Sequence, residues 1–167
     1  MTSEKDVLKW IEDRFGIPRK LFSRFSLYSD QKGRVFLAPK NLAAEGIAVS
    51  VGMQIARIES RLKAEHGGKS QSHETEVPPS FFRLKPSTNL LQLFGRHAAR
   101  NALSVAKEQA VAYAKGDDIK LSQKPAGVSD GYVLLKYLGC PLGCGLLKEG
   151  QIKNVLPKAR RMNVKFA

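Results

Sequence analysis

Short apolar runs separated by glycine-containing turns dominate the C-terminal part of the chain. Residues 132–137, 142–147 and 151–156 have the composition of strands, and the turns between them are expected at 139–141 and 148–150. Closely spaced short strands with glycine turns are typical of small barrels. We therefore predict three consecutive antiparallel strands that curl into a small β-barrel.

A helix and a further strand are predicted just before these strands. Residues 107–115 have small apolar side chains at helical spacing, and Gly116 stands where a left-handed residue ends a helix. Residues 117–121 then lead into a strand, and residues 103–105 form a brief strand ahead of the helix.

The first half has a mixed pattern of helices and strands. Ser3 or Thr2 caps a first helix, and Gly16 ends it. Strands are expected near 25–28, at 34–38, as a pair within 46–58, and at 81–84. Trp10 and the aromatic residues Phe22, Phe25 and Tyr28 are expected to fill the core of this half, rather than to stack on bases.

A second helix is expected after Ser87 or Thr88, with leucines on one side. We predict that it bends near Gly95 and continues, so that Arg96 and Arg100 share one face. A domain boundary is predicted close to residue 100.

Positive charge is concentrated in the second half. The chain has 28 basic and 15 acidic residues, a net charge of +13, and residues 81–167 alone account for +10. An excess of this size favours a polyanionic partner, and nucleic acid over a generally solubilising surface. No apolar run approaches the roughly 20 residues that span a bilayer, so we expect a cytoplasmic protein without a membrane partner.

The C-terminal sequence resembles a known family. The run 115–119 followed by 131–137 is similar to a PUA domain, a pseudo-barrel that binds structured RNA. The segments Pro-Leu-Gly-Cys-Gly (141–145), Gly-Gln-Ile-Lys-Asn (150–154) and Pro-Lys-Ala-Arg-Arg (157–161) resemble the C-terminal region of Sun-type RNA cytosine-5 methyltransferases. The layout is also similar to that of proteins in which a pre-PUA domain precedes the PUA domain.

This resemblance implies an α+β fold with a pre-PUA-like domain at residues 1–100 and a PUA-like β pseudo-barrel at 101–167. The chain is too short to hold the methyltransferase cofactor domain as well. It also lacks a glycine-rich turn after a strand for the cofactor, and a Pro-Cys or Thr-Cys pair of the kind that supplies the nucleophile in that family. We therefore expect no enzyme activity, no cofactor and no catalytic residue.

The resemblance also points to the residues that contact RNA. In PUA domains RNA lies across the loop after the helix and the final strand. Lysine supplies a mobile charge for phosphate, arginine adds bidentate and stacking contacts, and glycine permits close backbone approach. Asn154 is expected to be structural. The candidate RNA-binding residues are Lys115, Gly116, Lys120, Lys153, Lys158, Arg160 and Arg161, with Arg96 and Arg100 as a second group that could equally be a solvated helix face.

Other chemistries have weaker support. Cys140 and Cys144 lack the further ligands that zinc requires, so we expect no metal and interpret both as small apolar core residues. The Gly67–Ser70 segment lacks the context of a phosphate loop. His97 and the Asp117-Asp118 pair are interpreted as ordinary surface and turn residues.

The predicted function is non-catalytic binding of structured RNA, ribosomal or transfer, in ribosome biogenesis or RNA modification. An RNA-modifying enzyme or a ribosome-assembly factor is the expected protein partner. Three alternatives remain: an accessory, substrate-binding subunit of an RNA methyltransferase, an adaptor for an acidic protein, and an RNA-modifying enzyme whose site the sequence does not reveal.

Overall fold

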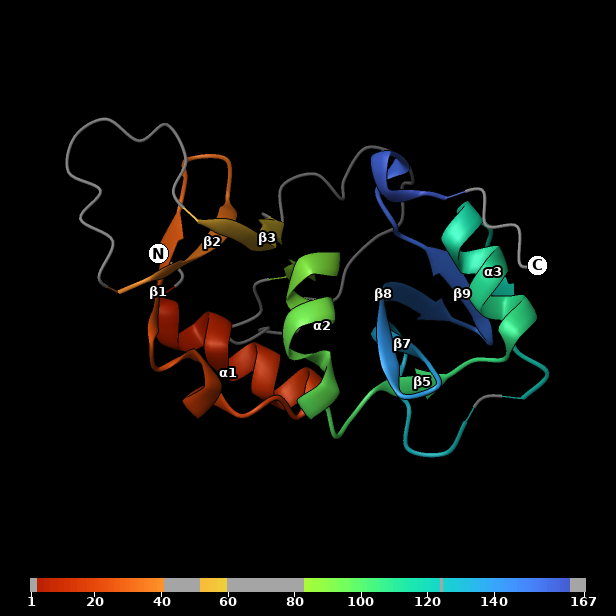
Figure 1. The fold of residues 1–167 in the computed structure, drawn as a ribbon. Coiled ribbons are helices and arrows are strands. Elements are labelled where there is room, and N and C mark those ends of the chain that lie inside the picture. Colours follow the sequence, from red (N-terminus) through yellow and green to blue (C-terminus); the bar gives the residue numbers. More distant parts are fainter. Residues whose placement is uncertain (1–2, 41–51, 60–82, 124, 163–167) are drawn as a thin grey trace, which may run out of the picture.

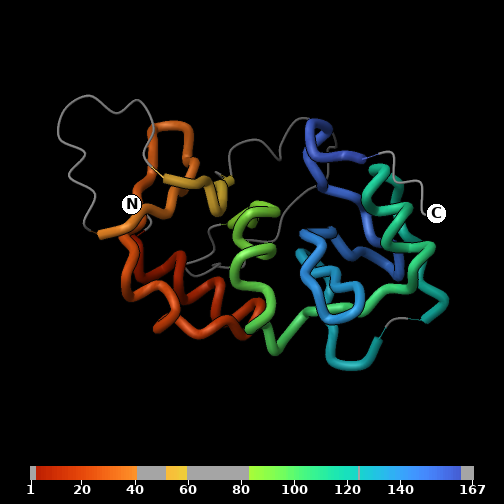
Figure 2. The backbone as a smooth tube through the Cα atoms, in the orientation of Figure 1, coloured from red at the N-terminus to blue at the C-terminus, as the bar shows by residue number. Residues whose placement is uncertain are grey.

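The computed structural model describes residues 3–40, 52–59, 83–123 and 125–162. It has the α+β fold predicted from the sequence, with two separate sheets. Helix α1 (Glu4–Phe15) lies with the first sheet, helix α3 (Lys107–Lys115) lies with the second, and helix α2 (Thr88–Phe94) stands between them (Figure 1). The backbone trace shows the same path from the first sheet through α2 to the second (Figure 2).

The first sheet is a four-stranded antiparallel meander. Its strands β1 (Phe25–Ser29), β2 (Arg34–Pro39), β3 (Met53–Glu59) and β4 (Arg83–Pro86) follow in chain order. Of the strand pair predicted within 46–58, only β3 falls among the described residues. Residues 81 and 82 of the predicted strand at 81–84 also lie outside them.

Helix α1 begins and ends where the sequence predicts. The Ser3 hydroxyl accepts from the Asp6 amide at 3.2 Å, and the Asp6 carboxylate accepts from the Ser3 amide at 2.9 Å. Hydrogen bonds donated to the Asp6 carboxylate by the Ser3 amide and the Ser3 hydroxyl lower the pKa of this carboxyl below its ordinary value. Gly16 ends the helix in the left-handed region, at φ 66°. A short 3₁₀ helix, η1 (Arg19–Phe22), then leads into β1.

One apolar cluster fills the space between α1 and the first sheet. Val7, Ile11 and Phe15 of the helix are buried in it, Phe22 is buried beside them, and Trp10 and Phe25 pack against it. Tyr28 is the exception to the predicted core. Its side chain is 46% exposed, because alternation along β1 turns it to the opposite face of the sheet from Leu27.

Helix α2 is shorter than predicted. The Ser87 hydroxyl accepts from the Leu90 amide at 3.2 Å and caps the helix, but the helix ends at Phe94. The 3₁₀ helix η3 (Gly95–His97) follows, and Ala98 is already extended. The prediction that Arg96 and Arg100 share a helix face is therefore wrong. Gly95 is buried and lies close to β7 (Gly131–Tyr137), where an added Cβ would be 2.9 Å from a Leu134 methyl. Close packing against β7 therefore determines where α2 ends.

The second sheet has five strands in the order β5-β7-β8-β9-β6 and curls as a half-barrel. Strand β5 (Ala102–Ser104) is parallel to β7, whereas β8 (Cys140–Lys148), β9 (Gln151–Asn154) and β6 (Ile119–Lys120) pair antiparallel. The strands predicted from the C-terminal sequence are thus confirmed. Helix α3 has the predicted bounds.

Two boundaries in this sheet differ from the prediction. The turn between β7 and β8 is formed by Leu138 and Gly139, both at positive φ, so Cys140 belongs to the strand and is exposed. Strand β9 ends at Asn154, because the Asn154 side chain turns to bond the end of α3. Cys144 is fully buried, as predicted for a core cysteine, whereas the same prediction for Cys140 is wrong because Cys140 is exposed.

The two halves share packing and a polar network. Leu134 of β7 and Cys144 of β8 belong to the same apolar cluster as α1 and the first sheet. Arg14 of α1 donates from Nε to the Tyr132 carbonyl at 2.7 Å and from Nη2 to the Ser129 carbonyl at 2.9 Å. Burial lowers the pKa of the Arg14 guanidinium. The predicted division at residue 100 stays a prediction.

Candidate nucleic-acid interface

Six of the predicted RNA-binding cations belong to the elements that meet near the end of helix α3. They come from the last residue of the helix, from strands β6 and β9, and from the segment that follows β9, which contains the 3₁₀ helix η4 (Lys158–Arg160). All six side chains are exposed. We call them the C-terminal basic surface: Lys115, Lys120, Lys153, Lys158, Arg160 and Arg161.

The end of α3 is fixed by its own hydrogen bonds. Gly116, at φ 102°, donates to the Tyr113 carbonyl at 3.0 Å, and the Asp117 amide donates to the Ala112 carbonyl at 2.9 Å. This pairing is the Schellman arrangement, which needs a left-handed residue. Glycine adopts that conformation without the steric cost that a Cβ would add.

Arg161 lies over this glycine. A Cβ added at Gly116 would be 2.6 Å from the Arg161 Nε. The chain's own arginine thus fills the space that a side chain at Gly116 would take, and the close approach of RNA to the Gly116 backbone stays a prediction. Because Gly116 has no side chain, the Arg161 side chain can lie over the helix end, next to Lys115.

Asn154 joins β9 to the same helix end. Its side-chain amide donates to the Tyr113 carbonyl at 2.7 Å and to the Asp117 carbonyl at 3.0 Å. Its backbone amide donates to the Asp118 carboxylate at 2.7 Å. These bonds satisfy carbonyls that a helix terminus leaves unpaired. The structural role predicted for Asn154 and the turn role predicted for Asp117-Asp118 agree with this geometry.

Strand register brings two of the lysines to one face of the sheet. Ile119 pairs with buried Ile152, and Lys120 pairs with Gln151. Lys153 follows Gln151 by two residues, so Lys120 and Lys153 are diagonal neighbours on the exposed side. The two lysines are far apart in the sequence, and the pairing of β6 with β9 brings them together.

The segment after β9 is held at both sides. The Met162 amide donates to the Ala114 carbonyl of α3 at 2.8 Å, and Arg160 donates from Nη1 to the Gln92 side chain of α2 at 3.1 Å. Arg160 and Arg161 therefore face different elements, one the helix between the sheets and the other the end of α3. This segment bridges the two halves.

A pocket of about 170 Å³ lies where this segment meets the first half. Arg160 and Pro157 form one side of it. The other side consists of uncharged residues from β3 and the start of α2: Gln54, Ser87, Thr88 and Asn89. Sequence reasoning did not find this pocket, because its sides are more than 60 residues apart in the chain and no local pattern marks them.

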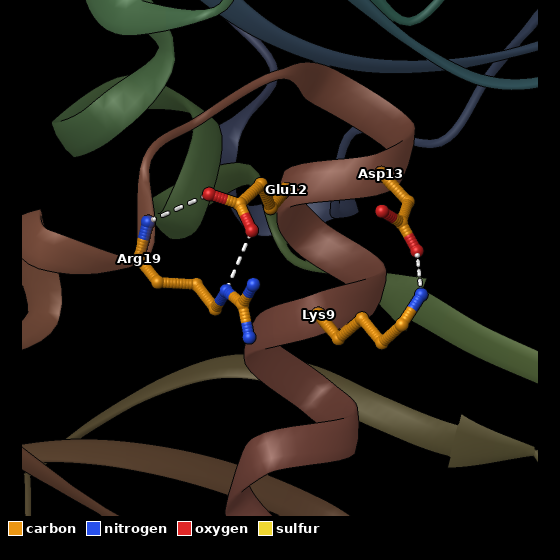
Figure 3. A network of polar contacts seen from close by, with 4 residues as sticks. All are labelled: Lys9, Glu12, Asp13 and Arg19. Carbon is orange, nitrogen blue, oxygen red and sulfur yellow. Dashed lines mark hydrogen bonds and ion pairs between the residues drawn. The ribbon is translucent and has the colours of Figure 1, made fainter.

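The cations of the C-terminal basic surface differ from Lys9 and Arg19 near the first helix, which face carboxylates. Lys9 of α1 donates to Asp13 at 2.7 Å, and Arg19 of η1 donates to Glu12 of α1 at 2.5 Å (Figure 3). Within the described part of the chain, none of the six cations forms an ion pair with a carboxylate.

Arg96 and Arg100 are exposed but are not joined to this surface by any contact among the described residues. Arg96 donates from Nε to the His97 imidazole at 2.9 Å. The Arg100 amide donates to the Phe15 carbonyl at 3.0 Å, and its side chain lies near Gly16. Arg100 therefore lies at the end of α1, whereas the contact shown for the Arg96 side chain is with its neighbour His97.

The described residues offer no metal site and no activated nucleophile. No group of three or more His, Cys, Asp or Glu side chains among them is placed to hold a metal ion. Burial raises the pKa of the Cys144 thiol, which keeps it protonated and unreactive. His66, His73 and the Gly67–Ser70 segment lie outside the described residues. No helix in the described ranges is long and apolar enough to cross a membrane.

A comparison with protein families finds a match within the C-terminal part of the chain. Residues 100–162 match the family model described as the Methyltransferase RsmF PUA domain. This confirms the resemblance to a PUA domain and to the C-terminal region of RNA methyltransferases. The match contains no catalytic methyltransferase domain and does not include residues 1–99, so the pre-PUA interpretation stays a prediction. A search of curated proteins found no match to the chain.

Proposed function

We propose that this protein binds structured RNA through the C-terminal basic surface and does not itself modify the RNA. The observation that carries the proposal is the placement of six exposed cations, without carboxylate partners among the described residues, around the helix end of a segment that matches a PUA domain. The resemblance of this segment to a PUA domain implies that it binds RNA.

The chemistry of these side chains suits a phosphate backbone. Lys115, Lys120 and Lys153 provide point charges on a rigid helix end and sheet. Arg160 and Arg161 provide planar groups that can bind phosphate bidentately or stack on an exposed base. Structured RNA is recognised mainly by shape and by contacts to phosphate and the 2′-hydroxyl, so no base-reading motif is required.

The wider role follows from the resemblance. We propose that residues 1–100 and 101–167 are two domains, that the RNA is ribosomal or transfer RNA in the cytoplasm, and that a separate enzyme or assembly factor acts on it. The protein would then position RNA for that partner in ribosome biogenesis or RNA modification, including as an accessory subunit of an RNA methyltransferase.

The test compares three polyanions over a salt series. Affinity is measured for a transfer RNA, a ribosomal RNA fragment and a DNA duplex, with the wild type and with an Arg160→Ala/Arg161→Ala variant. Loss of two phosphate contacts should reduce the slope of log affinity against log salt by about 1.4 to 1.8. A Lys9→Ala/Arg19→Ala variant is the matched control, because it removes two cations that already face carboxylates.

Preference for structured RNA, lost in the C-terminal variant and kept in the control, supports the proposal. Equal binding of all three polyanions would mean that the charge is generic. Binding of none would favour an adaptor for an acidic protein, and tight binding of S-adenosylmethionine by the pure protein would favour an enzyme.

A further inference from the structure

The face of the first sheet that points away from α1 has a row of like charges. Arg34 of β2 pairs with Arg57 of β3, and Arg57 pairs in turn with Lys85 of β4. Each of the three is therefore directly opposite the next across adjacent strands. Like charges in this position destabilise a sheet, so the row has an energetic cost in the free protein.

Strand alternation places these side chains outside the core. Val35 and Leu84 are buried in the apolar cluster, so their neighbours Arg34 and Lys85 point to the other face. The side chains of Arg57 and Lys85 are exposed. This outer face of the first sheet lies opposite α1, which lies below β1 to β3 in Figure 1.

Only one member of the row is neutralised within the described ranges. Arg34 donates to the Asp30 carboxylate at 2.6 Å, and its guanidinium lies 5.5 Å from the centre of the Phe36 ring. Arg57 and Lys85 form no ion pair with a described carboxylate. Two positions along, Glu59 stands opposite Arg83, so an acidic residue is used on this same strand pair but not between Arg57 and Lys85.

Aromatic side chains flank the charges on the same face. Tyr28 pairs with Phe36 across β1 and β2, and Phe36 pairs with Gln54 of β3. Tyr28 is 46% exposed, which leaves its ring open to stacking. Cations beside exposed rings on a sheet are the arrangement that binds single-stranded nucleic acid, with phosphates on the cations and bases on the rings.

The outer face is continuous with the C-terminal basic surface. Gln54, at the end of the aromatic row, lines the 170 Å³ pocket together with Arg160. One strand leaving the C-terminal basic surface can therefore cross this pocket and reach Lys85 and Arg57 without passing over α1. The 3₁₀ helix η4, which contains Arg160, is at the top of the view in Figure 1, on the side away from α1.

We propose that the outer face of the first sheet binds an unpaired stretch of the same RNA, with Arg57 and Lys85 on its phosphates. This inference extends the proposed function, because it assumes that the structured part of the RNA occupies the C-terminal basic surface. It explains why Arg57 and Lys85 stand opposite one another without a described carboxylate between them: the RNA backbone supplies the missing negative charge.

The experiment uses an RNA hairpin with a blunt stem and the same hairpin with a single-stranded extension. Two phosphate contacts at 0.15 M salt correspond to about a tenfold gain in affinity from the extension. This gain should disappear in Arg57→Glu and fall by about fourfold in Lys85→Gln, while affinity for the blunt hairpin stays unchanged. Lys5 is exposed on α1, away from this face. The Lys5→Glu variant makes the same change of charge and should keep the gain in affinity.

Thermal stability separates a binding role from a structural one. Arg57→Glu replaces two repulsive cross-strand pairs by attractive ones, so its Tm should equal or exceed that of the wild type. The inference is overturned if the extension adds no affinity, if Arg57→Glu weakens the blunt hairpin equally, or if the gain is lost together with a lower Tm. If the wild type does not bind the blunt hairpin but binds the extended one in a way that depends on Arg57, the proposed function is refuted and this inference is retained. If the wild type binds neither RNA, both are refuted.

Discussion

Replacement of Gly116 by alanine tests how the end of α3 positions Arg161. The alanine has to adopt φ 102°, and its Cβ would lie 2.6 Å from the Arg161 Nε, so the arginine has to leave. A left-handed conformation costs a residue with a side chain about 1–2 kcal/mol. For a chain of this length we expect the Tm to fall by about 2–8 °C.

The displaced arginine gives this prediction a second readout. If Arg161 contacts a phosphate from its position over Gly116, the Gly116→Ala variant loses about one phosphate contact. At 0.15 M salt this corresponds to about a fourfold loss of affinity for structured RNA. Gly150→Ala is the matched control. Gly150 also has positive φ, at 79°, but an added Cβ meets nothing within 4 Å. It should lower the Tm without lowering affinity.

A double-mutant cycle isolates the contact between the two residues. Alanine at 116 should be less costly when Arg161 is already alanine, with a coupling of at least about 0.5 kcal/mol in unfolding free energy. Additive effects on stability, or an unchanged RNA affinity in Gly116→Ala, would refute the account of this helix end. Unfolding is followed by circular dichroism, and binding by fluorescence anisotropy.

Three further predictions concern stability and reactivity. Asn154→Ala leaves the carbonyls of the α3 end unpaired and should cost about 1–3 kcal/mol of unfolding free energy, measured in urea. A thiol-alkylating reagent should label only Cys140 in the native protein and both cysteines after unfolding, as counted by mass spectrometry, because Cys144 is buried and its pKa is raised. Burial raises the pKa of Tyr132 to about 12, so stability should fall as pH rises from 10 to 12, and Tyr132→Phe should flatten this loss; an equal loss in the variant would contradict it.

Local patterns predicted the elements of the fold well. The capping residues Ser3 and Gly16, the bounds of α3 and the left-handed Gly116 follow from interactions within one helical turn, which a sequence displays directly. The C-terminal strands were predicted for the same reason. The turn at Leu138 was missed because a leucine at positive φ has no local signal in the sequence.

Contacts between distant segments could not be predicted. The contact of Arg161 with Gly116 depends on how the segment after β9 packs on α3. The bond from Arg160 to Gln92 and the network around Arg14 depend on how the two halves pack. The continued helix expected for Arg96 and Arg100 failed for a related reason, because close packing of Gly95 against Leu134 ends α2 there. The residue types of the candidate interface were therefore visible in the sequence, whereas their arrangement was not.

The most direct test of RNA binding at the C-terminal basic surface is a residue-resolved NMR titration of the labelled protein with a transfer RNA. The account predicts that amide resonances of residues 115–120, 151–154 and 157–162 shift together as RNA is added, with the same apparent affinity. Shifts confined to other parts of the chain, or uniform weak changes that vanish at 0.15 M salt, would contradict it.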